Sequence, residues 1–185
     1  MRISENRYTK DMRKYELARR MIAYEVRTKT ITAWTGLTKY RIQTLFREYP
    51  ELGKFKRHRG EPPSQPAFFS RSLLHEAESS ALATIELEMS VIPVPSEGEF
   101  LGTLATLARG ERLLNAFDLF RTLVPEPKIS LEHAVLLTKE LAQGYTLSLH
   151  RCVRCGGLMV VDRLGRTHVD CAFCRTKART PKRPK

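Results

Sequence analysis

The chain near its end reads Cys152-Val153-Arg154-Cys155-Gly156-Gly157, continues for a hairpin-sized insert, and then reads Cys171-Ala172-Phe173-Cys174. Each run holds a Cys-x₂-Cys pair, which turns tightly enough to aim both sulfurs at one ion. Two disulfides or a redox dithiol pair are the alternatives. Two matched Cys-x₂-Cys pairs in a sequence that resembles an intracellular protein favour zinc over both. The pattern therefore predicts one structural Zn²⁺ per chain, held by Cys152, Cys155, Cys171 and Cys174.

The insert between the two cysteine pairs has the pattern of a small hairpin. Residues 158–161 form a strand-like run, residues 163–166 offer a turn, and residues 167–169 can return as the partner strand. Such a lobe has little apolar core, so we expect the metal to replace one and chelation to unfold it. His150 and His168 could compete as ligands, and we interpret both as outer-shell or surface residues because four thiolates suffice.

The whole chain has the composition of a soluble globular protein, with 185 residues of which 42% are hydrophobic and 28% charged. This length suits one domain with a small appendage. No apolar run reaches the length of a membrane span, and no apolar signal-peptide core follows the first residues. We therefore expect a cytoplasmic protein without a membrane partner.

The net charge of +12 is unevenly distributed. Residues 1–60 contain 16 Lys and Arg against 6 Asp and Glu, residues 61–150 contain 6 against 12, and residues 151–185 contain 10 against 2. Separated basic ends are typical of two contacts with a polyanion such as DNA. Basic faces that stay solvated or meet acidic proteins are the alternative.

The N-terminal segment predicts three helices. Residues 12–28 carry apolar side chains at helical spacing, and Asp11 is a plausible N-cap. Residues 30–49 then have the pattern of a short helix, a turn at Gly36, and a second helix that Thr38 caps. This is the pattern of a helix-turn-helix motif.

The exposed side of that second helix is the predicted DNA-binding surface. Arg41 and Gln43 can read base edges through paired hydrogen bonds, whereas Lys39 and Arg47 suit phosphates. A plain amphipathic helix pair with a solvated face is the alternative. The residues that we expect to contact or flank DNA are Thr38, Lys39, Tyr40, Arg41, Gln43, Thr44 and Arg47.

A proline-rich loop at residues 51–65 follows, with a basic run at 54–59. Proline stops the preceding helix because it fixes φ and lacks a backbone donor. The basic run either adds phosphate contacts or is simply solvated. Phe68-Phe69 is interpreted as an anchor that holds the loop on the core.

The acidic middle, residues 67–144, is predicted to be helical and to bind a partner subunit. Its expected helices are residues 73–85, two helices within 100–124 interrupted near Arg109-Gly110, and residues 131–142 between the N-cap Ser130 and the stop signal Gly144. The basic segment 175–185 is too poor in apolar residues to fold.

Catalysis is not expected. The carboxylates of Glu76 with Glu78, and of Glu86 with Glu88, stand two residues apart on a helix and point to different faces, so we interpret them as solvated. The sequence has no glycine-rich phosphate loop, nucleophile elbow or spare cysteine.

The fold class is therefore predicted as mainly α, with an N-terminal helix-turn-helix and a small C-terminal Cys₄ module like a zinc ribbon. The expected divisions are a helical domain at 1–150 that contains the helix-turn-helix at about 12–49, a zinc-binding module at 151–178, and a basic tail at 179–185.

Three stretches together resemble the FlhC family, the C subunit of the bacterial flagellar master transcriptional activator. They are Gly36-Leu37-Thr38-Lys39-Tyr40-Arg41-Ile42-Gln43-Thr44-Leu45-Phe46-Arg47-Glu48, the loop from Gly60 to Phe69, and the paired cysteines. Phe68-Phe69 stands where that family's pattern has Trp-Phe, and the basic tail also differs, as expected of a divergent paralogue.

The resemblance implies zinc on the four cysteines and binding to promoter DNA of flagellar (motility) genes. It also implies a hetero-oligomer with an FlhD-type D subunit, four D and two C subunits being the family expectation, which recruits RNA polymerase. A zinc-containing protein-protein adaptor with only non-specific nucleic-acid binding is the alternative, and a nuclease or transposition factor comes third.

Overall fold

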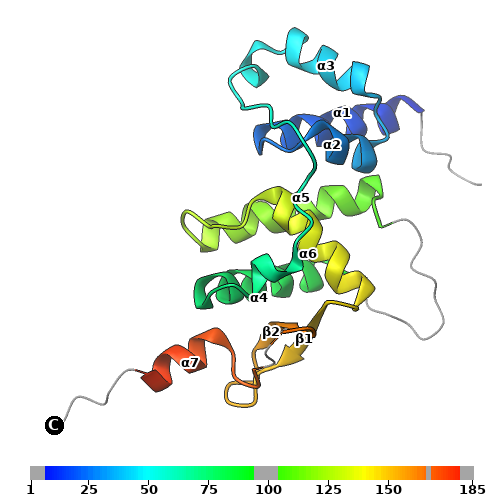
Figure 1. Ribbon diagram of the computed structural model, residues 1–185. Helices are drawn as coiled ribbons and strands as arrows, with labels where there is room; N and C mark the ends of the chain where they lie inside the picture. The colour runs from blue at the N-terminus through cyan, green and yellow to red at the C-terminus, as the bar shows by residue number, and fades with distance from the viewer. Residues whose placement is uncertain (1–6, 94–103, 166–167, 180–185) are drawn as a thin grey trace, which may run out of the picture.

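The computed structural model describes residues 7–93, 104–165 and 168–179 and is mainly helical. Its elements are α1 (Arg7–Ala23), α2 (Thr28–Thr35), α3 (Lys39–Glu48), the 3₁₀ helices η1 (Pro50–Leu52) and η2 (Pro66–Phe69), α4 (Leu73–Glu88), α5 (Leu107–Leu123), α6 (Leu131–Gln143), β1 (Leu147–Arg151), β2 (Leu158–Asp162) and α7 (Ala172–Arg179). Figure 1 shows three layers: α1 to α3 at one end, α4 to α6 in the middle, and β1, β2 and α7 at the other end. Within those residue ranges, no helix combines the length and apolarity that a membrane span needs.

The first helix differs from the prediction at both of its ends. It begins at Arg7, so Asp11 lies inside α1 and is not its N-cap. It ends at Ala23. Two residues later, Glu25 adopts a positive φ of 57°, and its N–H donates to the carbonyl of Ile22. The N–H of Val26 donates to the carbonyl of Met21. This is a Schellman motif, and it stops the helix although no glycine marks the position.

The two helices that follow have the predicted turn, although α2 begins at Thr28, before the predicted start at residue 30. Gly36 adopts a φ of 70° and closes α2, and the Thr38 hydroxyl accepts a hydrogen bond from Arg41 N–H at the start of α3. Ile42 and Leu45 are buried on the inner face of α3. Buried Thr35 donates its hydroxyl to the carbonyl of Ile31, which satisfies a polar group at a core position.

The predicted break near Arg109-Gly110 is wrong, because α5 runs without interruption from Leu107 to Leu123. The predicted start of this region near Phe100 lies outside the described residues. Gly110 is buried where α5 approaches α1 and α2 closely, and a Cβ added there would lie 2.8 Å from Leu17 Cδ2 and 3.1 Å from Trp34 Cε3. The glycine therefore serves close helix packing, not helix termination.

We expect Gly110→Leu to lower the free energy of unfolding by about 2 kcal/mol, because overpacking a core costs about 1–3 kcal/mol and outweighs the better helix propensity of leucine. Urea unfolding of both proteins measures the difference. Ala108→Leu adds similar bulk on the exposed side of the same helix and should be nearly neutral. Equal stability of Gly110→Leu and wild type would contradict this packing.

Two acidic residues of α4 are buried, so the prediction that they are solvated is wrong for Glu78 and Glu86, whose exposed fractions are 5% and 0%. Glu78 accepts a hydrogen bond of 2.9 Å from the backbone N–H of Lys128. Glu86 accepts one of 3.0 Å from the Thr138 hydroxyl of α6. The two buried acids therefore bind partners on different segments of the chain.

The helix α6 agrees with its prediction, since the Ser130 hydroxyl accepts from His133 N–H and Gly144 ends the helix with a φ of 67°. Phe69 is buried, and the ring of Phe68 stacks on His133 with centroids 3.8 Å apart. The paired aromatic residues thus anchor the end of the proline-rich loop on α6, as expected.

The C-terminal sheet has a different partner strand from the one predicted. β2 pairs antiparallel with β1, from Leu147 opposite Asp162 to Arg151 opposite Leu158. His168 and Val169 belong to no strand, and Thr167 lies outside the described residues. The pairing therefore brackets the first cysteine pair, because β1 leads into it and β2 leads away.

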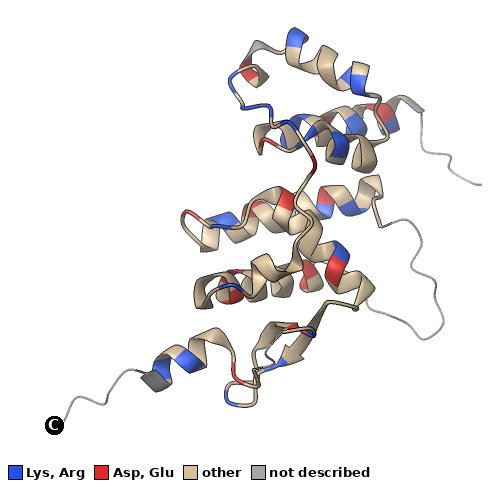
Figure 2. Cartoon of the chain, in the orientation of Figure 1, with Lys and Arg blue, Asp and Glu red and all other residues tan. Residues whose placement is uncertain are grey.

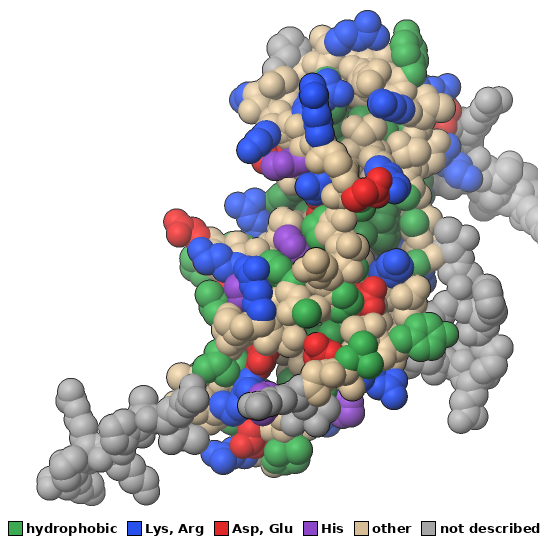
Figure 3. Space-filling model, in the orientation of Figure 1, with side chains coloured by type: hydrophobic (Ala, Val, Ile, Leu, Met, Phe, Trp, Pro, Cys, Tyr) green, Lys and Arg blue, Asp and Glu red, His purple; other side chains and the backbone are tan. Residues whose placement is uncertain are grey.

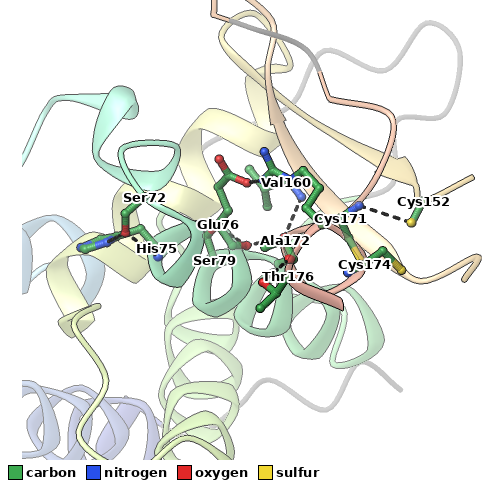
Figure 4. A network of polar contacts seen from close by, with 12 residues as sticks. Ser72, His75, Glu76, Ser79, Cys152, Val160, Cys171, Ala172, Cys174 and Thr176 are labelled. Carbon is green, nitrogen blue, oxygen red and sulfur yellow. Dashed lines mark hydrogen bonds and ion pairs between the residues drawn. The ribbon is translucent and has the colours of Figure 1, made fainter. Parts of the chain in front are cut away.

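Residues 175–179 also differ from the prediction, because they belong to α7 and are not an unfolded tail. Residues 180–185 lie outside the described residues. The guanidinium of Arg175 pairs with the carboxylate of Glu76 on α4, and Val160 N–H donates to the Ser80 hydroxyl at 3.0 Å. These contacts hold β2 and α7 against α4 (Figure 4).

Candidate metal centre and nucleic-acid interface

The four cysteines come together at the far end of the molecule from α3 (Figure 1). Cys152 follows β1, Cys155 ends the next turn, Cys171 precedes α7 and Cys174 lies in its first turn. Their Sγ atoms all lie within 4.8 Å of one another. Figure 4 shows three of them, with the backbone N–H of Cys171 directed at the sulfur of Cys152.

The donor set fits one metal ion. A tetrahedral site with metal–sulfur bonds of about 2.3 Å has sulfur–sulfur edges of about 3.8 Å. Cys155 Sγ and Cys171 Sγ lie 3.7 Å apart, which matches such an edge. Four protein ligands complete a tetrahedron and leave no open position for a reactive water, so the arrangement suits a structural ion.

Backbone hydrogen bonds prepare the thiols to act as ligands. Gly156 takes a φ of 71° and donates its N–H to the carbonyl of Cys152, which closes the first turn. Cys171 N–H donates to Cys152 Sγ at 3.3 Å, and Cys174 N–H donates to Cys171 Sγ at 3.5 Å. Such bonds favour the thiolate, and those from Cys171 and Cys155 lower the pKa of Cys152 to about 6.

The fourth thiol has the opposite shift. Burial, together with the neighbouring sulfurs, raises the pKa of Cys174 to about 12. Four adjacent thiolates without a cation would repel one another, so at least one proton stays bound until a metal displaces it. Metal binding at this cluster should therefore release protons and weaken in acid.

Two further contacts join the cysteine turns to each other. Val153 N–H donates to the carbonyl of Val169 at 3.1 Å, and the Arg154 guanidinium pairs with Asp170 at 2.9 Å. The sequence patterns did not single out these contacts or the anchors on α4, because the partners are far apart in the chain. His150 and His168 are exposed and are not members of the cysteine cluster.

The predicted DNA-binding residues lie together on the solvent side of α3. Thr38, Lys39, Tyr40, Arg41 and Arg47 are exposed, while Gln43 and Thr44 are partly exposed. Arg47 donates to the Thr44 hydroxyl at 3.1 Å, and its guanidinium lies 5.9 Å from the ring centroid of Tyr40. Figure 2 shows basic residues on this terminal layer, with α3 at the outer edge of the molecule.

The two candidate sites are therefore separate. The cysteine cluster and α3 occupy opposite ends of the stack, with the layer of α4 to α6 between them (Figure 1). A single linear ligand would have to run along the molecule to contact both.

The sequence matches no protein-family model and no curated protein.

Proposed function

We propose that this protein is the DNA-binding subunit of a heteromeric transcriptional activator of flagellar genes, a divergent member of the FlhC family. In this proposal it works in the cytoplasm, binds promoter DNA together with an FlhD-type D subunit, recruits RNA polymerase and catalyses no reaction. The observation that carries the proposal is the polar, basic outer face of α3, backed by a buried inner face.

The chemistry of that face suits a duplex. Arg41 and Gln43 offer side chains that form paired hydrogen bonds with base edges, and the cations of Lys39 and Arg47 suit phosphates on either side. The inner residues Ile42 and Leu45 fix α3 on the layer beneath it, so the outer face is presented rigidly. A helix held in this way at the edge of a molecule can enter a major groove.

Zinc is the metal that we propose for the cysteine cluster, since four thiolates in a closed tetrahedron suit Zn²⁺. Bound there, the ion would supply structural cross-linking and no reaction chemistry. Cys152, Cys155, Cys171 and Cys174 would hold it, while Arg154 and Asp170 keep the two turns in register.

The experiment that tests the proposal is a duplex-binding titration of the metal-loaded full chain, with and without a co-purified D-type subunit. Promoter fragments and scrambled duplexes are compared at several salt concentrations. We expect tighter, partner-dependent binding to promoter fragments, with affinity falling steeply as salt rises. Equal affinity for every duplex, with or without the partner, would overturn the proposal.

Substitutions at Arg41 separate base reading from charge. Arg41→Lys keeps the positive charge but cannot form the bidentate hydrogen bonds of a guanidinium. We therefore expect discrimination between promoter and scrambled duplex to fall by roughly 5- to 150-fold, while the salt dependence of the affinity is unchanged. Arg41→Ala should lose at least as much discrimination with little change in the salt slope, because the slope counts phosphate contacts and Arg41 contacts bases. Unchanged discrimination in both variants would remove Arg41 from the base contacts.

A protein-protein adaptor is the second candidate function, because apolar side chains are exposed in the cysteine lobe. Phe173 and Val153 are 64% and 70% exposed, so the lobe presents apolar surface that a partner protein could cover. A stable protein complex without any salt-dependent binding to a duplex would favour this candidate.

A further inference from the structure

A groove of about 750 Å³ lies beside α3. Its walls come from the corner between α1 and α2, from one flank of α3, and from residues 56–60 of the proline-rich loop. We call it the 56–60 groove. Figure 3 shows many Lys and Arg side chains over this end of the molecule. The cations that line it are Arg27, Lys29, Lys39, Lys56, Arg57 and Arg59.

The loop that forms the outer wall is held in a defined place. Glu25, in the positive-φ turn after α1, accepts a hydrogen bond from Lys56 N–H at 3.1 Å, and its other oxygen lies 3.1 Å from His58 Nε2. These bonds lower the pKa of Glu25, so the carboxylate stays charged and keeps the loop attached. The Arg57 guanidinium lies 4.7 Å from the ring centroid of Phe46 on α3, which closes the wall.

Much of the positive charge of the groove is not neutralised. Arg27 pairs with Glu132, and Lys29 pairs with Glu61. Three other cations, Lys39, Lys56 and Arg59, form no ion pair with any residue in 7–93, 104–165 or 168–179.

The two sides of α3 differ in charge. The opposite side borders a second groove, of about 410 Å³, whose lining includes the carboxylates of Glu16 and Glu48 as well as Tyr40 and Arg41. The only carboxylate lining the 56–60 groove is that of Glu25. A polyanion that crosses α3 is therefore drawn to the 56–60 side.

We propose that the 56–60 groove holds the phosphate backbone of one strand of duplex DNA while the outer face of α3 lies against the bases. The inference rests on the proposed function and adds a second element to its contact surface. Cations spread along an open groove from three segments of the chain suit successive phosphates, whereas a compact anion needs donors that converge on one point. Lys39 and Gln43 border both surfaces, so the strand would pass directly beside the base-reading residues.

The test compares two double variants of the full metal-loaded chain, with the D-type subunit where that is needed for solubility. Lys56→Ala with Arg59→Ala removes two exposed cations from the groove, whereas Lys54→Ala with Lys10→Ala removes two exposed cations that lie outside it. Both variants change the net charge equally. The probe is a mixed-sequence duplex, because phosphate contacts do not depend on base sequence.

We expect the groove variant to lower the slope of log affinity against log salt by about 1.8, as two lost phosphate contacts would, and to weaken binding at least about tenfold at low salt. The control variant should keep the wild-type slope within about 0.5, since distant charges are screened. Discrimination between promoter and scrambled duplex should persist in the groove variant and fail in Arg41→Lys.

Two results would overturn the inference while leaving the proposed function intact. In the first, the groove variant keeps the wild-type slope of log affinity against log salt. In the second, the control variant loses as much of that slope as the groove variant does. Saturable binding of inorganic pyrophosphate or polyglutamate that the groove variant abolishes, with its duplex slope unchanged, would assign the groove to a small anion or an acidic protein instead. No duplex binding by the wild-type chain at any salt concentration would overturn both the inference and the proposed function.

Discussion

Cys174→Ser is expected to reduce the bound metal from about one ion per chain to almost none after dialysis. Cys174 is one of the four clustered thiols and lies in the first turn of α7, so its loss removes both a proposed ligand and a link between that helix and the first cysteine pair. We expect the affinity for Zn²⁺ to fall at least about 100-fold, because losing an outer-shell partner alone costs 10- to 100-fold.

The lobe should then lose its structure. Apart from its cysteines, the described part of its small core contains two buried apolar side chains, Met159 and Val161, which contribute about 3–6 kcal/mol. Binding of a structural zinc ion contributes about 10–16 kcal/mol and so dominates this region. Limited proteolysis should cut the variant within residues 152–179, while the helices from α1 to α6 stay protected.

The matched control for this experiment is His168→Ala. His168 is exposed and lies near the second cysteine pair in sequence, but it is not in the cluster. We expect it to retain one metal ion and wild-type resistance to proteolysis. Full metal content and unchanged affinity in Cys174→Ser would show that this thiol is not a ligand.

Glu86→Gln is expected to make the protein more stable than wild type at pH 8 and about equally stable at pH 5. Complete burial in α4 raises the pKa of Glu86 to about 8 from its ordinary value of 4.5, although the Thr138 hydroxyl donates to one carboxyl oxygen. The folded protein therefore keeps a proton that the unfolded chain releases above pH 4.5. The contribution of the neutral acid to stability is fully present below pH 4.5 and is lost as pH rises through about 8.

The size of this effect follows from the separation of the two pKa values. Each pH unit between them changes the free energy of unfolding by about 1.4 kcal/mol, which gives a loss of up to about 5 kcal/mol by pH 8. Glutamine resembles the protonated acid in shape and stays neutral, so it avoids this loss. Urea unfolding from pH 5 to pH 8 measures the difference.

Glu88→Gln is the control, since it makes the same chemical change at an exposed position near the end of the same helix. Subtracting the wild-type curve from each variant's curve removes the contribution of all other titrating groups. Parallel curves for wild type and Glu86→Gln would show that Glu86 is charged in the folded protein.

The sequence alone determined the features that depend on neighbours within a few residues. The turn at Gly36, the caps at Thr38 and Ser130, and the end of α6 at Gly144 all have their predicted conformations. A cap or a glycine turn is closed by hydrogen bonds that span two to four residues, so its signal is local. The close approach of the four cysteines was also predictable, because the x₂ spacing fixes half of the geometry.

The tertiary structure decided the features whose partners are distant in the chain. Gly110 permits a close approach to Leu17 and Trp34 in place of the expected helix break, and β2 pairs with β1 instead of residues 167–169. Glu86 is enclosed because other elements pack over α4, among them α6 with Thr138. Burial and strand pairing depend on which surfaces meet after the chain has folded, and periodicity within one segment contains no information about the surface opposite it.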